Sequence, residues 1–384
     1  MNSFPSLSPA RTPVLAAEKP SPRSYGLDDV VVADTELSDV DGQAGRLLIH
    51  GYDLAELAGK VSFEALLGLL WDGRLPELSV EREIVRSLAQ ARSAAHAELW
   101  RLTPALALDD PMDALRAGVA ALPCPADERV AALQLTASVA VISAAWWRLR
   151  GRERPLAPDP ELTHAHDVLR LFGLACDSGP VRALETYLVT VADHGLNAST
   201  FAARVVASTA SDTVSAVTAA LGALKGKLHG GAPGPVLTLL DSIETPERAR
   251  AELEAQLARG ERIMGMGHRV YRVRDPRADV LERALLELSD GHPSPRLLLA
   301  RAVESSATEL LAERYPTRNL RANVEFFTAV LLEALGIPRE LFTNVFAVGR
   351  CAGWCAHIAE QRRVGRILRP ASRYVGPAPA SRVG

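Results

Sequence analysis

The sequence predicts a mostly α-helical fold with a small β-hairpin near the N-terminus. Apolar residues recur at helical spacing along most of the chain, strands and helices do not alternate as a parallel sheet requires, and internal repeats are not evident. The 384 residues are 48% hydrophobic and 23% charged, so the chain can bury a large core without disulfide bonds. This composition excludes a globally disordered or collagen-like protein.

The predicted hairpin joins two short segments rich in β-branched and aliphatic residues. Residues 30–35 and 46–51 flank the turn-rich sequence Asp39-Val40-Asp41-Gly42. Residues 1–25 precede this hairpin and contain many prolines, so we expect a disordered tail there. This tail lacks the long apolar stretch of a secretory signal, and the cytoplasm is therefore the expected location.

The helices that follow are predicted from apolar spacing and from residues that start or end helices. A helix over residues 63–70 is ended by Gly73, and one over residues 168–174 is closed by Ser178-Gly179-Pro180. Another begins at Thr245-Pro246-Glu247, with a capping hydroxyl and a proline at the first helical position, and ends at Gly260. Residues 128–149 form the longest predicted helix. Its apolar run Leu135–Trp147 is shorter than the roughly 20 residues of a membrane span and predicts a buried core helix.

Charge and cysteine content exclude several classes of protein. The net charge of −3 lacks the basic excess that is typical of nucleic-acid binders. Cys351 and Cys355 lie four residues apart with His357 beyond them, which indicates either half of a metal site or two small residues on one face of a packed helix. Because no second Cys/His pair has matching spacing, we expect a packed helix and no bound metal.

Between residues 194 and 268, three histidines lie next to glycine, in His194-Gly195, His229-Gly230 and Gly267-His268. Glycine allows the backbone to approach a ligand closely and to adopt a positive φ. One such pair is compatible with a structural histidine. Three pairs within 75 residues indicate a shared site.

An arginine-rich segment surrounds the third of these histidines. Residues 262–277 hold five arginines and one acid in a chain of negative net charge. The segment is either a solvated basic face or a pocket for an anion, since the planar guanidinium group can bind carboxylates and phosphates bidentately. The upstream Gly265-Met266-Gly267 would let backbone amides meet a flat or phosphorylated ligand.

Glu325 is an acid set among apolar residues in Asn323-Val324-Glu325-Phe326-Phe327. Desolvation there would raise its pKa toward a value useful for a general base. The alternative is a carboxylate in the first turn of the following helix, where the helix dipole favours it. The residues alone leave both readings open.

Taken together, the ordered motifs closely resemble the citrate synthase family. They are Asp193-His194-x-x-Asn197-Ala198-Ser199-Thr200-Phe201, then Leu221-Gly222-Ala223-Leu224-Lys225-Gly226-x-Leu228-His229-Gly230-Gly231, then Gly267-His268-Arg269-Val270-Tyr271 through Asp275-Pro276-Arg277. The resemblance covers about residues 26–377. It implies a homodimer of a two-domain helical chain, with a large domain formed by residues 26–230 and 337–384 and a small domain formed by residues 231–336.

The implied activity is citrate synthase, which condenses acetyl-CoA with oxaloacetate and then hydrolyses the citryl thioester without a metal or redox cofactor. By resemblance, Glu325 would remove a methyl proton from acetyl-CoA, His229 would bind the thioester oxygen, and His268 would act as general acid at the oxaloacetate carbonyl. The remaining roles are binding ones: His194, Arg277 and Arg350 for oxaloacetate, Arg369 for the substrate of the other subunit, Gly265, Met266 and Gly267 for adenine, and Arg272 for a CoA phosphate. No nucleic acid or membrane is an expected partner.

One position departs from the family's usual pattern, because Glu325 stands where most members have aspartate. The longer side chain extends the carboxylate by about 1.5 Å, which affects the expected rate and acyl preference more than the reaction class. Two alternatives to citrate synthesis therefore stay open. The chain is either a 2-methylcitrate synthase using propionyl-CoA, or a weakly active or non-catalytic paralogue that binds CoA or a dicarboxylate.

Overall fold

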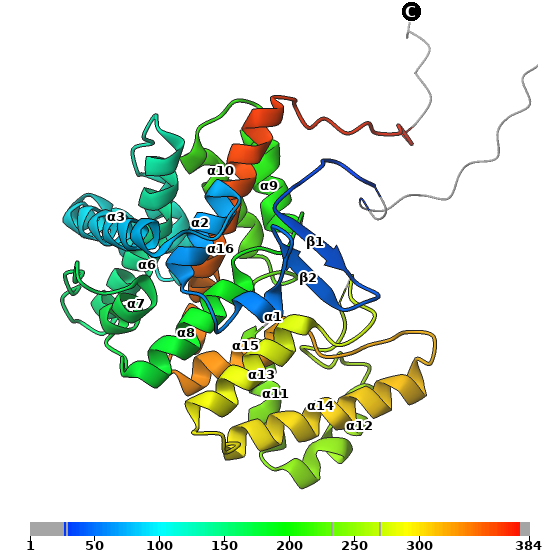
Figure 1. Ribbon diagram of the computed structural model, residues 1–384. Coiled ribbons are helices and arrows are strands. Elements are labelled where there is room, and N and C mark those ends of the chain that lie inside the picture. The colour runs from blue at the N-terminus through cyan, green and yellow to red at the C-terminus, as the bar shows by residue number, and fades with distance from the viewer. Residues whose placement is uncertain (1–26, 28–29, 232, 269, 377–384) are drawn as a thin grey trace, which may run out of the picture. The chain divides into compact units, whose positions relative to one another are not determined.

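The computed structural model describes residues 27, 30–231, 233–268 and 270–376. Within these ranges the chain is mostly helical, which confirms the predicted fold class (Figure 1). The chain from Thr35 onward forms one compact unit. The division into a large and a small domain stays a prediction, and the tail expected over residues 1–25 lies outside the described residues.

A small antiparallel sheet precedes the helices, with β1 (Ser38–Asp41), β2 (Arg46–Ile49) and β3 (Tyr52–Asp53) in that order. The predicted first strand over residues 30–35 is wrong, because β2 pairs with β1 in a register that places Ser38 opposite Ile49. Leu47 and Ile49 are fully buried and fix this register, whereas Val31 is 84% exposed. Asp41 Oδ1 accepts the amides of residues 43 and 44, which forms the turn.

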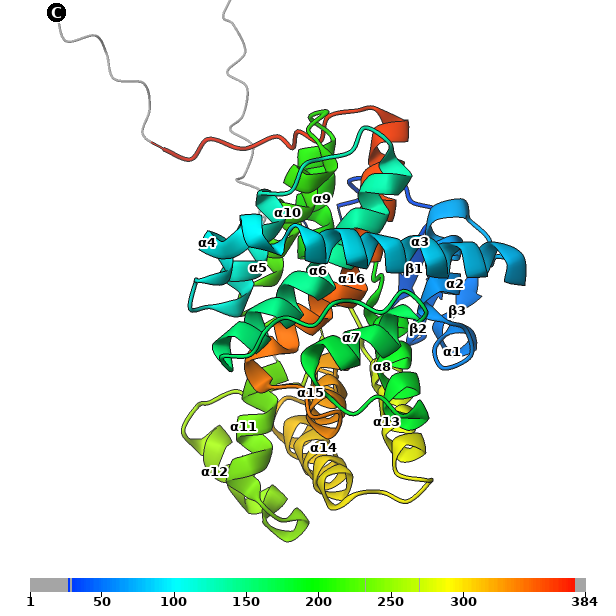
Figure 2. The same cartoon turned by 90° about the vertical axis from the view of Figure 1, so that its left-hand side faces the viewer.

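Sixteen α-helices lie in the described part of the chain (Figures 1 and 2). The first eight are α1 (Leu54–Leu57), α2 (Phe63–Asp72), α3 (Leu78–Ala97), α4 (Thr103–Leu106), α5 (Pro111–Ala120), α6 (Glu128–Arg150), α7 (His164–Phe172) and α8 (Ser178–Val191). The others are α9 (Ala198–Ala207), α10 (Thr213–Leu224), α11 (Pro233–Ile243), α12 (Ala249–Ala258), α13 (Pro276–Leu288), α14 (Pro295–Arg314), α15 (Val324–Ala334) and α16 (Phe342–Val364). Short 3₁₀ turns occupy Leu99–Leu102, Pro246–Arg248 and Arg339–Leu341.

Helix boundaries follow local chemistry, with two corrections to the sequence predictions. Gly73 ends α2 with a φ of 74°, as predicted, but α7 is ended by Gly173 with a φ of 76°. Residues 178–180 instead begin α8. The N–H groups in the first turn of a helix have no intrahelical partner, so a proline there, which lacks an N–H, costs no hydrogen bond. Thr245 makes no side-chain cap bond, and the chain forms a 3₁₀ turn before α12 begins.

Two long helices organise the core. Helix α6 packs against α3, α5 and α16, and 78% of its most apolar window is buried, as predicted for a core helix. By length and composition alone it is the one helix in the described part that could cross a membrane. Helix α16 also packs against α8, α9 and α10, while α11 to α15 gather at one end of the unit (Figure 2).

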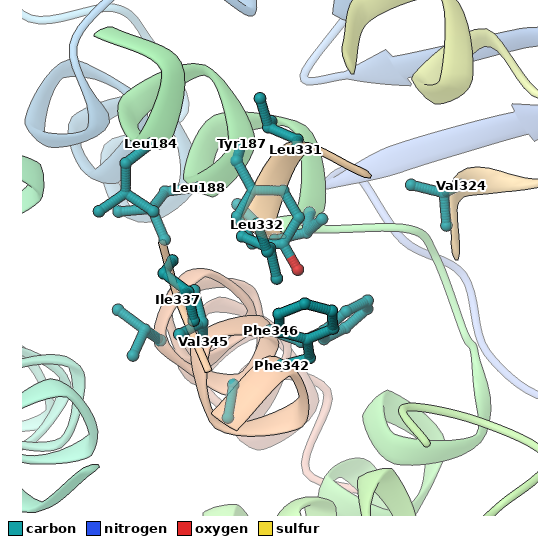
Figure 3. Close-up of a cluster of buried hydrophobic side chains, with 14 of the residues drawn as sticks. Leu184, Tyr187, Leu188, Val324, Leu331, Leu332, Ile337, Phe342, Val345 and Phe346 are labelled. Carbon is teal, nitrogen blue, oxygen red and sulfur yellow. The ribbon is translucent and has the colours of Figure 1, made fainter. Parts of the chain in front are cut away.

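An apolar cluster joins α8, α15 and α16 (Figure 3). Tyr187, Leu332 and Phe346 are buried there, one from each helix. Because the three helices share this core, the end of α8, the start of α15 and the middle of α16 are held in fixed relation to one another. The candidate site is built on these parts of the three helices.

Candidate active site

Six residues singled out from the sequence come together near the ends of several helices and the middle of α16: His194, His229, His268, Arg277, Glu325 and Arg350. Their proximity shows in their electrostatics. Burial lowers the pKa of each histidine, and the charge of Arg277 lowers each further. Burial raises the pKa of Glu325, and the same Arg277 charge opposes that rise. The six residues therefore lie close together in the folded chain, and their joint role as a site stays a prediction.

Close packing of α16 on α8 places Arg350 and His194. A Cβ atom on Gly353 would overlap the Ala192 carbonyl oxygen, and one on Gly349 would lie 3.0 Å from the Leu188 carbonyl oxygen. The glycines thus let the two backbones approach, and Arg350 Nε donates to the Val191 carbonyl. His194 lies three residues beyond the end of α8 and is 7% exposed.

A buried hydrogen-bond chain supports the residue that precedes His194. Asp193 Oδ1 lies 3.0 Å from His357 Nε2, and His357 Nδ1 lies 3.0 Å from Arg204 Nη1. Because a guanidinium group can only donate, His357 Nδ1 accepts and His357 Nε2 carries the proton toward Asp193. This chain anchors the end of α8 to α9 and α16.

The hydrogen bonds of His268 define its tautomer. Its Nδ1 accepts from the amides of Val270, at 3.0 Å, and Tyr271, at 3.1 Å, so the proton of the neutral ring is on Nε2. The His268 ring lies edge-on to the His194 ring, with centroids 5.4 Å apart. Burial and the Arg277 charge lower the His268 pKa to about 4. At neutral pH, His268 is therefore an uncharged donor beside His194.

His229 is neutral for the same reason and is held from two sides. Burial, with the charges of Arg350 and Arg277, lowers its pKa to about 4. Its Nε2 lies 2.8 Å from the hydroxyl oxygen of Ser199 on α9. Thr343 Oγ1 donates to the carbonyl of the adjacent Gly230 at 2.9 Å, which ties this loop to α16.

The two arginines of the site differ in how much of their charge is already paired. Arg277 donates through Nε and Nη2 to Asp275, at 3.0 and 2.7 Å. Burial lowers the pKa of Arg277, but the charge of Asp275 and its hydrogen bonds, with smaller contributions from Tyr271 and Glu325, together outweigh burial and the net shift is upward. Burial lowers the pKa of Arg350 to about 10, and its Nη2 has no partner among the described residues. Arg350 thus remains a cation with a free donor for an anionic ligand.

Glu325 lies in the first turn of α15, as the structural reading of the sequence required. Burial is also the largest cause of a raised pKa of this carboxyl group, which is the direction expected for a general base. The side chain is nonetheless partly accessible. Its role as a base stays a prediction. Asp275 Oδ2 accepts the Val324 amide at 3.2 Å, and this bond joins the start of α15 to Arg277.

The Gly265-Met266-Gly267 segment uses its backbone within the protein. Gly267 N–H donates to the Arg321 carbonyl at 2.7 Å, and Gly265 O accepts from Asn323 N–H at 3.0 Å. A Cβ on Gly265 would lie 2.7 Å from the Phe326 ring. The segment therefore packs beside the residues that lead to Glu325, with the Gly267 amide already occupied. Its contact with an adenine ring stays a prediction.

Arg272 and Arg369 lie at the margin of this site or outside it. Arg272 is exposed, and its charge contributes to lowering the pKa of His268. It also borders a surface cavity of about 590 Å³, which Arg301 and Arg321 line as well. Arg369 is exposed and follows Leu368, whose amide donates to Ser208 Oγ at the far end of α9. The ten residues of α9 place that end about 15 Å from its Asn197 cap. The structure therefore does not bring Arg369 to the site of its own chain.

Three site residues had no role in the sequence predictions. Ser199 contacts His229, Tyr271 Oη lies 3.2 Å from His194 Nε2, and Asp275 holds Arg277. Each lies inside one of the quoted motifs, but no spacing rule indicates which neighbour it contacts. Cys351 and Cys355 are buried free thiols on α16, and no His, Cys, Asp or Glu cluster among the described residues could hold a metal ion.

Several known proteins are similar to this chain over most of its length. A family model described as citrate synthase, C-terminal domain, matches residues 26–371. A putative citrate synthase 2 of Mycobacterium tuberculosis is 39% identical over 93% of this chain and 94% of its own. The citrate/2-methylcitrate synthase of Bacillus subtilis is 37% identical, covering 92% of this chain and 96% of its own.

A solved structure with ligands is also similar. It is the ternary complex of carboxymethyl coenzyme A and oxaloacetate with citrate synthase from the thermophilic archaeon Thermoplasma acidophilum. The TM-score is 0.82 with 27% identity, covering 93% of this chain and 97% of that one.

Proposed function

The chain belongs to the citrate synthase family of acyltransferases, and we propose that it condenses acetyl-CoA with oxaloacetate and water to give citrate and CoA. The observation that carries the proposal is the convergence of one partly buried carboxylate, three uncharged histidines and two arginines. This set matches the needs of a Claisen-type condensation.

The first step removes a proton from the methyl group of acetyl-CoA. The raised pKa of Glu325 makes its carboxylate a stronger base than an exposed glutamate. Negative charge then develops on the thioester oxygen, where a donor on the neutral His229 stabilises it. Neither group suffices alone, because the methyl proton is only weakly acidic.

The second step forms the carbon–carbon bond to oxaloacetate. His268 presents Nε2–H to the ketone oxygen as that oxygen gains charge. Arg350 and Arg277, with His194, bind the two carboxylates of oxaloacetate. Water then hydrolyses the citryl thioester and releases CoA, so the cycle requires no metal or redox cofactor.

A steady-state assay that follows free thiol tests this proposal. Purified protein supplied with oxaloacetate and acetyl-CoA should release CoA and form citrate, with no release when oxaloacetate is omitted. Absence of turnover in a folded sample that still binds oxaloacetate, as read by thermal shift, would instead support a non-catalytic paralogue.

The acyl group is the finer question, because the family includes both citrate and 2-methylcitrate synthases. One methylene is worth about 1–3 kcal/mol in a hydrophobic pocket, so both activities can occur in one site. Running the same assay with propionyl-CoA gives the ratio of the two kcat/KM values. A ratio that favours propionyl-CoA would assign 2-methylcitrate synthesis.

The proposal extends to CoA binding and to a homodimer in the cytoplasm. Arg272, exposed at the rim of the site, is suited to bind a CoA phosphate, while Gly265, Met266 and Gly267 meet the adenine. Arg369 would complete the oxaloacetate site of the partner chain. Support for this last role comes from its exposure and from its distance from the site of its own chain.

A further inference from the structure

An arginine without any role in the proposed reaction joins the loop of His268 to the helix of Glu325. Arg274 lies six residues after His268 and directly before Asp275, and its side chain is 27% exposed. Its guanidinium carbon lies 4.8 Å from the centroid of the Phe327 ring, which is fully buried in α15 two residues after Glu325. A cation over the face of an aromatic ring is attracted to it. Arg274 is therefore in contact with the helix that carries the proposed base.

Three carboxylates from two other helices fix the orientation of this guanidinium group. Glu304 on α14 accepts from Arg274 Nε at 2.6 Å and from Nη2 at 2.9 Å. Nη2 also donates to Glu282 on α13 at 2.7 Å, and Nη1 donates to Asp279 on the same helix. A planar guanidinium group can bind several carboxylates in its plane while its face rests on a ring, which an ammonium group cannot do. Arg274 therefore ties its own loop to α13, α14 and α15.

The backbone of this loop determines where the His268 ring lies. The amides of Val270 and Tyr271 donate to His268 Nδ1 and so fix the ring to the backbone. The loop is held at this end by the hairpin, because Arg272 N–H donates to the Gly42 carbonyl at 2.8 Å. A Cβ atom on Gly42 would overlap the Val270 carbonyl oxygen, so the two backbones are in close contact. Anything that attaches this loop to the rest of the chain therefore also places the ring.

We propose that Arg274 is a positioning residue, which sets the separation between the His268 ring and the Glu325 carboxylate by tying the loop of one to the helix of the other. The condensation needs both groups within reach of the same reacting carbon atoms, and an error of about 1 Å in placement can cost roughly 100-fold in rate. The effect on rate rests on the proposed function. The effect on the surroundings of His268 does not, because it is a property of the folded chain.

The kinetic test is Arg274→Lys, which keeps the positive charge but loses the planar fork and the flat face that rests on Phe327. The loop and α15 can then shift relative to each other, so we expect kcat to fall by about 10-fold or more. The KM for oxaloacetate should stay within about 2-fold, because the arginines proposed to bind its carboxylates are unchanged. A rise in this KM with an unchanged kcat would overturn the proposal, since Arg274 would then act on substrate binding.

A matched control is Arg296→Lys. Arg296 on α14 is 26% exposed and, like Arg274, binds carboxylates on two other elements. Its partners are Glu333, on the last turn of α15, and Asp241 on α11, each at 2.7 Å. Both substitutions should lower the free energy of unfolding, but only Arg274→Lys should lower kcat. Values of kcat within about 2-fold of each other in the two variants would show that Arg274 contributes to stability alone.

A second variant tests whether Arg274 acts through α15. Phe327→Leu removes the ring face and leaves the three carboxylate contacts of Arg274 in place, and it should also lower kcat. In the double variant the two losses should not multiply, because both variants break the same contact. Phe172→Leu, at a 2% exposed position on α7, controls for the cavity that this change leaves. Equal kcat values for Phe327→Leu and Phe172→Leu would refute the inference even if Arg274→Lys did not fold.

The placement of the loop is measured without turnover by titrating His268. Burial is the largest cause that lowers its pKa, to about 4. Water reaches the ring when the loop loosens, so the pKa should rise toward the ordinary value of 6.5 in Arg274→Lys and stay unchanged in Arg296→Lys. NMR of histidine-labelled protein follows this titration, with the His268 signal assigned by its loss in His268→Asn. An unchanged His268 pKa in folded Arg274→Lys would refute the inference, and this failure is distinct from an absence of citrate synthesis by the native chain.

Discussion

Replacing Glu325 with glutamine tests the proposed base directly. The change keeps the shape of the side chain and removes its ability to accept a proton from carbon. Asp275 also acts on Glu325 electrostatically, but it is bonded to Arg277 and to the Val324 amide and cannot take over the role. General-base catalysis contributes about 10²- to 10⁴-fold, so Glu325→Gln should lower kcat by at least about 100-fold.

Binding and stability should respond differently from rate. The folded-state pKa of Glu325 is raised, so at neutral pH its ionised form destabilises the folded chain. Glu325→Gln removes that cost, and its Tm should be equal to or above that of the native chain at pH 7. The difference should shrink as the pH falls from neutral through the raised pKa of Glu325, and it should vanish below about 4.3, where an exposed glutamate is itself protonated. Oxaloacetate should still raise the Tm of the variant, because histidines and arginines bind it.

Deuterium exchange into the methyl group of a non-reacting acetyl-CoA analogue isolates the proton-removal step. Exchange should be lost in Glu325→Gln and kept in Glu333→Gln, a control on the last turn of the same helix whose carboxylate pairs with Arg296. Undiminished exchange in Glu325→Gln would show that another group is the base. The companion variant Glu325→Asp retracts the carboxylate by about 1.5 Å and should slow turnover by roughly 100-fold, as an error of about 1 Å in placement does.

The other predictions concern the histidines, the subunit interface and the helix contact. His229→Ala and His268→Ala should each lower the condensation rate by more than about 100-fold in folded protein, and normal turnover in either would remove that residue from the mechanism. Mixing inactive Arg369→Ala with inactive His268→Ala should restore activity in heterodimers with one intact site; no recovery despite confirmed subunit exchange would count against sharing. Gly353→Ala should lower the free energy of unfolding by about 1–3 kcal/mol through overpacking. By contrast, Gly222→Ala, where a Cβ meets open space, should raise it by up to about 1 kcal/mol, and denaturant titration of both variants compares these effects.

Periodicity predicted the helical fold class and the core helix α6 because both depend on apolar spacing within one segment. Periodicity failed at residues 30–35, where β-branched residues favour a strand. The strand that pairs with β2 is β1, in a register that buries Leu47 and Ile49. It failed at residues 178–180 for a related reason, since a serine, glycine and proline run can end one helix or begin the next. Because α7 has already ended at Gly173, residues 178–180 begin the next helix.

The site shows the same limit at the level of side chains. Three glycine-flanked histidines within residues 194–268 were expected to converge, because glycine lets the backbone approach a ligand. His50 and His292 also adjoin glycine, so a glycine neighbour alone does not identify a site histidine. The partners Ser199 and Tyr271 could not be assigned, since their contacts cross from one loop or helix to another. Arg277 and Arg350 also looked equivalent in the sequence. Only the folded chain shows that Asp275 already holds one of them, whereas the other keeps a free donor.

One physical cause shifts the pKa values of all three proposed catalytic residues. Burial disfavours charge, so it raises the pKa of Glu325 and lowers the pKa values of His229 and His268 to about 4. At neutral pH the histidines are uncharged donors, and the Glu325 carboxylate is more basic than in water. Arg277 and Arg350 oppose the rise in the pKa of Glu325 and further lower the pKa of His229, so they favour an ionised base and an uncharged donor. A site with the same side chains at an open surface would lose both effects. The close approach of α16 to α8, which requires Gly349 and Gly353, is therefore a condition for the chemistry as well as for the fold.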